Sequence, residues 1–77
     1  MSIVGVVVVV DPHDEAAIER LGAVPGITLG PRRGARVALV IDEAEAHVRG
    51  RLEELQGMPG VLSVSPVFHA PEPLEAT

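Results

Sequence analysis

The chain has 77 residues, 47% of them hydrophobic with a single aromatic side chain, and a formal net charge of −5. This length accommodates one domain with an aliphatic core, and the lack of cysteine excludes disulfides and thiolate metal sites. The acidic balance does not suit the phosphate backbone of nucleic acid, so we expect no nucleic-acid partner.

The first half of the chain predicts a strand, a helix and a second strand. Residues 3–10 are almost continuously β-branched, which is typical of a strand buried on both faces. Asp11 and Pro12 follow as an N-cap and a proline at the first helical position, and this helix should end at Gly22. Residues 26–30 then predict a short second strand.

The second half of the chain repeats this order. The segment 30–34, Gly-Pro-Arg-Arg-Gly, has turn chemistry, so we expect residues 36–41 to return as the second strand of a hairpin. Asp42 and Glu45 have the spacing of a capping box and predict the start of a second helix. Residues 60–68 predict the fourth strand.

An internal repeat supports a duplicated fold. Val24-Pro25-Gly26-Ile27 and Met58-Pro59-Gly60-Val61 are related by an offset of 34 residues. The order βαββαβ predicts an α+β, ferredoxin-like fold, with a four-stranded antiparallel sheet of order 4-1-3-2 and both helices on one face. We expect one domain over residues 1–69 and a disordered tail, rich in proline and glutamate, over residues 70–77.

The central strands are more apolar than this fold requires. Two helices can cover only one face of the sheet, whereas both predicted central strands are apolar on both faces. The uncovered face should therefore carry a contiguous apolar patch, which is typical of an interaction surface. The pattern fits self-association and a dedicated partner equally well.

Other kinds of site are not indicated. The three histidines are far apart in the predicted fold, so we expect no metal site, and no phosphate loop or nucleophile elbow predicts an enzyme or a cofactor. The chain starts without a basic segment of the kind that opens a signal peptide, and Val6–Val10 is too short to span a bilayer. We therefore expect a cytoplasmic protein without stable membrane association.

Two segments resemble the NapD family. They are Leu21-Gly-Ala-Val-Pro-Gly-Ile27 and, with greater specificity, Gly60-Val-Leu-Ser-Val-Ser-Pro-Val-Phe-His69. The resemblance extends over about residues 3–70 and includes the valine-rich third strand with its acidic helix start. Pro66 departs from the family pattern, in which a larger aliphatic residue is usual, and it removes a backbone donor from the last strand.

The resemblance implies a chaperone function. NapD-like proteins bind the twin-arginine signal peptide of the catalytic subunit of periplasmic nitrate reductase, which depends on molybdenum, and delay its export until the cofactor is loaded. Such a peptide has a cationic start and an apolar, helix-prone stretch. We expect it to lie as an amphipathic helix on the uncovered sheet of a monomer or weak homodimer, with carboxylates at the rim meeting its arginines.

The family pattern also implies which side chains face the peptide. NapD-like sequences tend to be polar at the positions of Val9 and Ile41, although this assignment turns Arg36 and Asp42 toward the helices. We expect Leu39→Asp to abolish peptide binding without unfolding the protein. The predicted peptide-binding residues are Val7, Val9, Val37, Leu39, Ile41, Ser63, Ser65 and Val67, with Ile3 on the same face.

An alternative function is that of a ligand-sensing or dimerising ferredoxin-like module. The effector domains of Lrp/AsnC-type regulators have a similar Pro-Gly-Val-x-x-Val strand. Such modules assemble through their sheets and bind amino acids at the interfaces. A stable oligomer that hides the sheet would favour this alternative, and a monomer that binds a twin-arginine peptide would favour the chaperone.

Overall fold

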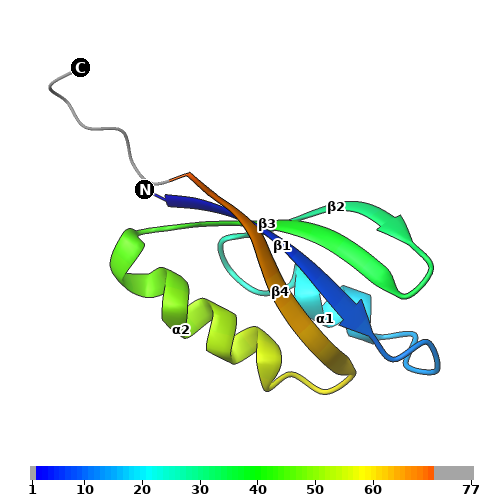
Figure 1. The fold of residues 1–77 in the computed structure, drawn as a ribbon. Coiled ribbons are helices and arrows are strands. Elements are labelled where there is room, and N and C mark those ends of the chain that lie inside the picture. The colour runs from blue at the N-terminus through cyan, green and yellow to red at the C-terminus, as the bar shows by residue number, and fades with distance from the viewer. Residues whose placement is uncertain (1, 71–77) are drawn as a thin grey trace, which may run out of the picture.

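The computed structural model describes residues 2–70. The four strands form one antiparallel sheet in the order β2-β3-β1-β4, and both helices lie on the same face of it (Figure 1). This arrangement confirms the predicted ferredoxin-like fold and its strand order. The elements, in chain order, are β1 (Ser2–Val10), α1 (Ala17–Gly22), β2 (Ile27–Arg33), β3 (Arg36–Glu43), α2 (Glu45–Gln56) and β4 (Val61–Ala70).

The core lies between the sheet and the helices. Every second residue of β1 is buried, and the residues of β3 opposite Val4, Val6 and Val8 are buried as well. Complete burial of a Val, Leu or Ile side chain contributes about 1.5–3 kcal/mol, so this layer supplies most of the stability of a small domain. The apolar core consists of Val4, Val6, Val8, Val10, Ala17, Leu21, Val24, Val37, Leu39, Ile41, Val48 and Leu55.

Helix α1 begins later than the sequence predicts. The Asp11 carboxylate accepts a hydrogen bond from the His13 amide at 2.9 Å, so it closes a local turn and caps no helix. Asp14 accepts a bond from the Ala16 amide at 3.2 Å and pairs with Arg20 at 2.7 Å. Because aspartates compete for backbone donors in this way, they favour turns ahead of a helix. The predicted N-cap at Asp11 is therefore wrong.

The hairpin between β2 and β3 is also longer than predicted. Strand β2 continues through Pro31, and the turn is formed by Gly34 and Ala35. The register with β3 shifts between Leu29 and Arg32, so Gly30 and Pro31 form a bulge in an edge strand. A missing N–H is tolerated there because the outer side of an edge strand has no partner strand.

The start of α2 differs as well. Asp42 belongs to β3 and lies opposite Ile3, while the helix N-cap is Ala44, without a side-chain hydrogen bond. The predicted capping box is therefore wrong. Of the predicted tail, residue 70 belongs to β4, and residues 71–77 lie outside the described part of the chain. No helix within residues 2–70 is long and apolar enough to cross a membrane.

Candidate functional site

The face of the sheet opposite the helices is not covered by another element of residues 2–70 (Figure 1). We call it the open face. Its exposed apolar side chains include Ile3, 46% exposed, and Val40, 37% exposed, and Val7 and Val9, nearer the hairpin, are half-buried. Strand register and alternation assign to the open face the residues Ile3, Gly5, Val7, Val9, Thr28, Arg33, Arg36, Ala38, Val40, Asp42, Ser63 and Ser65.

Four of the predicted peptide-binding residues lie together on this face. Val7 is opposite Ser65 and Val9 is opposite Ser63, so the two valines and the two serines form adjacent rows on β1 and β4. Val67 lies at a register shift of β4 and is 65% exposed. The serine hydroxyls can donate to or accept from a bound chain beside the apolar valine row.

The prediction is wrong for the three residues from β3. Val37, Leu39 and Ile41 are at most 1% exposed and form part of the core beneath the helices. Leu39→Asp would therefore place a carboxylate in the core and unfold the protein, contrary to the expectation from the sequence. On β3, Ala38 and Val40 take the open-face positions.

The physical reason is the register between β1 and β3. Residues directly opposite each other in an antiparallel pair share a face, and Val8 lies opposite Val37 while Val9 lies opposite Arg36. Hydrophobicity alone could not assign the faces because the residues of both parities on β3 are apolar. Charge gives no consistent signal either, because Arg36 and Asp42 have the open-face parity whereas Glu43 has the opposite one.

The carboxylates are distributed differently from the predicted rim. Of the two that the strands carry, Asp42 has the open-face parity, while Glu43 points to the helix layer and pairs with Arg51 at 2.8 Å. Hydrogen bonds to Glu43 and Glu54 raise the pKa of Arg51 above its ordinary value. The ion pairs of Arg51 with Glu43 and Glu54 therefore connect α2 to the sheet, and these two carboxylates do not form a rim around the open face.

A hollow in the open face lies near the hairpin. Its volume is about 400 Å³. Arg33 and Arg36 flank it, and neither has an ion-pair partner among residues 2–70. This end of the open face is therefore basic. The lining residues are Val7, Pro31, Arg32, Arg33, Arg36 and Ala38.

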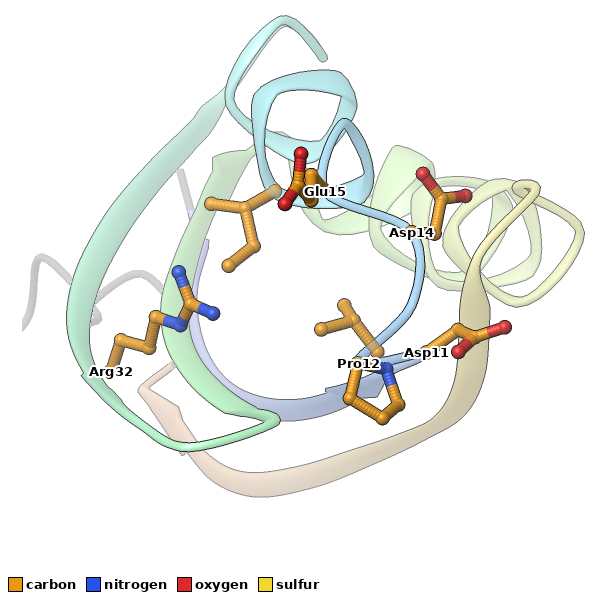
Figure 2. A pocket seen from close by; sticks show the side chains of 7 residues that line it. Asp11, Pro12, Asp14, Glu15 and Arg32 are labelled. Carbon is orange, nitrogen blue, oxygen red and sulfur yellow. The ribbon is translucent and has the colours of Figure 1, made fainter.

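A second hollow, of about 280 Å³, lies on the helix side of the hairpin. Figure 2 shows Arg32 reaching into it from β2, across from Asp11 and Pro12, with Glu15 at another side. The Arg32 Nε donates to the Gly34 carbonyl at 3.0 Å, so the side chain is partly engaged in the hairpin turn. This hollow has mixed charges, and Arg32 lines both it and the hollow of the open face.

Within the described residues, no three His, Cys, Asp or Glu side chains are placed to hold a metal ion together. No protein-family model matches the chain, and no curated protein matches it.

Proposed function

We propose that this protein is a cytoplasmic chaperone that binds a twin-arginine signal peptide on its open face. The client would be the catalytic subunit of a molybdenum-dependent nitrate reductase, held back from export until its cofactor is loaded. The observation that carries the proposal is an uncovered sheet face on which Ile3, Val7 and Val40 present apolar side chains. The proposed identity of the client rests on the resemblance of residues 60–69 to the NapD family.

The open face fits the apolar stretch of such a peptide. Covering one of its aliphatic side chains contributes up to about 1.5–3 kcal/mol, so a few of them suffice for micromolar binding once the costs of association are subtracted. A helix is a suitable conformation because its backbone is satisfied internally, and only side chains then have to match the sheet. While it is bound, the apolar stretch is covered and withheld from the export machinery.

Two residues of equal exposure on opposite faces allow a matched test. Val40 and Leu29 are both 37% exposed. Val40 has the open-face parity, whereas Leu29 lies opposite the core residue Leu39 and next to Gly22 of α1. The variants Val40→Asn and Leu29→Asn make the same kind of change in neighbouring strands without altering net charge.

The probe is a synthetic peptide with two adjacent arginines followed by about 13 leucine and alanine residues, a length that spans about 20 Å as a helix. Isothermal titration calorimetry should show binding to the unaltered protein, at least about tenfold weaker binding to Val40→Asn and little change for Leu29→Asn. No binding to the unaltered protein, or an equal loss in both variants, would contradict the proposal.

Self-association is the competing use of the same surface. Light scattering over a range of concentrations should show a monomer or a weak dimer that the peptide dissociates. A dimer that persists on dilution and does not yield to the peptide would contradict the chaperone function. That outcome would favour the ligand-sensing or dimerising module.

A further inference from the structure

The open face carries opposite charges at its two ends. On β3, Arg36 lies opposite Val9, and Asp42 lies opposite Ile3 at the other end of the same strand pair. Arg33 lies opposite Arg36 across the hairpin, so two guanidinium groups share the first end. The face is therefore basic at the hairpin, acidic at the far end of β3 and apolar between them.

The basic end of the open face has the features of a site for an anionic group. Val7, Ala38 and Pro31 form an apolar lining beside Arg33 and Arg36, in the hollow of about 400 Å³. On the helix layer, Arg20 pairs with Asp14 and Arg51 pairs with Glu43 and Glu54, while the exposed Arg49 has no ion-pair partner among residues 2–70. Neither Arg33 nor Arg36 has a carboxylate partner in the part of the chain that the structure describes. Unpaired guanidinium groups beside apolar surface favour a carboxylate or the carbonyl end of a helix.

We propose that the peptide lies on the open face in one direction only, with its two arginines at Asp42 and its C-terminal end at Arg33 and Arg36. This inference rests on the proposed function and adds to it the orientation of the peptide. Three electrostatic effects favour this direction. The peptide arginines lie at Asp42, the positive N-terminal end of the helix dipole also lies at Asp42, and its negative C-terminal end lies at Arg33 and Arg36. The reverse direction places the peptide arginines against Arg33 and Arg36, which is repulsive.

The dimensions of the face agree with this orientation. Arg36 and Asp42 are six residues apart on β3, which corresponds to about 20 Å along a strand. A helix of about 13 residues has the same length. A dibasic start followed by an apolar stretch of this length therefore reaches both charged ends at once, and an acidic residue directly after the apolar stretch would lie at the basic hollow.

The orientation can be measured with spin labels. The probe is the same dibasic Leu/Ala peptide, carrying a nitroxide at either its N-terminus or its C-terminus, and the readout is broadening of amide signals in the ¹⁵N-labelled protein. The N-terminal label should broaden Ile3 and Asp42, and the C-terminal label should broaden Arg33 and Arg36. The opposite pattern, or equal broadening of both ends by each label, overturns the orientation while peptide binding to the open face stands. Absence of binding to the face overturns the proposed function and this inference with it.

Charge variants provide a second, independent test. Two versions of the peptide end in Glu-Glu or in Lys-Lys, and the unaltered protein should prefer the acidic version by about three- to fivefold, as expected for a partly exposed charge pair. Arg36→Glu should remove or reverse this preference. Arg49→Glu should retain it, because Arg49 is an exposed residue of α2 and makes the same change of charge on the helix layer. A preference that is absent in the unaltered protein, or that Arg36→Glu leaves unchanged, overturns the inference.

Arg33→Gln serves as a milder variant if Arg36→Glu does not fold, as judged by circular dichroism. It removes one of the two guanidinium groups and introduces no carboxylate. The preference for the acidic peptide should fall by about twofold while binding of a neutral-ended peptide is retained. An unchanged preference in folded Arg33→Gln likewise overturns the inference.

Discussion

Gly26 and Gly60 are equivalent residues in the two halves of the fold. Each has a positive φ, +81° and +86°, and each carbonyl accepts a 2.7 Å backbone hydrogen bond, from Asp42 and from Asp11 respectively. The bond joins the turn after a helix to the end of a central strand in the other half. This shared geometry explains why the Pro-Gly-hydrophobic step occurs twice in the sequence, since only glycine adopts a positive φ without strain.

Gly60→Ala should strongly destabilise the protein. A Cβ at this position would lie 2.5 Å from Asp14 Oδ2 and 2.9 Å from the Ala17 Cβ, in addition to the strain of the positive φ. We expect a loss of about 2–3 kcal/mol and a melting temperature lower by about 10 °C. Gly34→Ala is the control, because its φ is +60° and a Cβ there meets no atom of the described chain within 4 Å. It should cost only about 1 kcal/mol, and equal losses in the two variants would show that the close contact is unimportant.

Gly50→Ala, in contrast to Gly60→Ala, should stabilise the protein. Gly50 lies inside α2, where a Cβ would meet no atom of residues 2–70 within 4 Å. Alanine restricts the unfolded chain and favours the helix, so urea unfolding should show a gain of about 0.5–1 kcal/mol. A loss of stability would mean that the backbone of α2 is closely approached at this point.

Leu39→Ala and Val40→Ala should lower the free energy of unfolding by different amounts, because the two side chains lie on opposite faces of β3. Leu39 is 1% exposed in the core, so its truncation should cost about 2–5 kcal/mol. Val40 is 37% exposed on the open face, and its truncation should cost less than about 1 kcal/mol. Urea unfolding of both variants measures the difference, and the reverse ranking would show that the face assignment is incorrect.

Asp42→Asn should weaken binding of the dibasic peptide and reduce its dependence on salt. Asp42 is the carboxylate with open-face parity among the strand residues, and an exposed ion pair of this kind contributes about two- to fivefold in affinity at low ionic strength. Titrations at several salt concentrations give both quantities. Glu53→Gln, an exposed change of the same charge on α2, should bind like the unaltered protein. If the two variants bind alike, Asp42 does not contact the peptide arginines.

Much of the architecture could be predicted because its signals are local. The almost continuous β-branched run of β1 and the repeated Pro-Gly step each identify an element from its own residues. The predicted boundaries of the elements are less accurate where a side chain could form a hydrogen bond with more than one partner. Asp11 and Asp14 could have capped a helix, but they bond nearby amides and Arg20 and thereby delay α1.

The amino-acid sequence is sufficient to predict the order of the elements, and hence an apolar sheet face that two helices cannot cover. The sequence does not reveal which residues of β3 form that face. Val37 and Leu39 on one side of the strand and Ala38 and Val40 on the other are all apolar, so the strand has no alternation of polar and apolar residues to distinguish its two sides. The assignment follows from the antiparallel register between β1 and β3, which places Val8 opposite Val37 and exists only in the folded sheet. The same register brings Arg33 and Arg36 to one end of the open face and Asp42 to the other, an arrangement of charges that no local pattern contains.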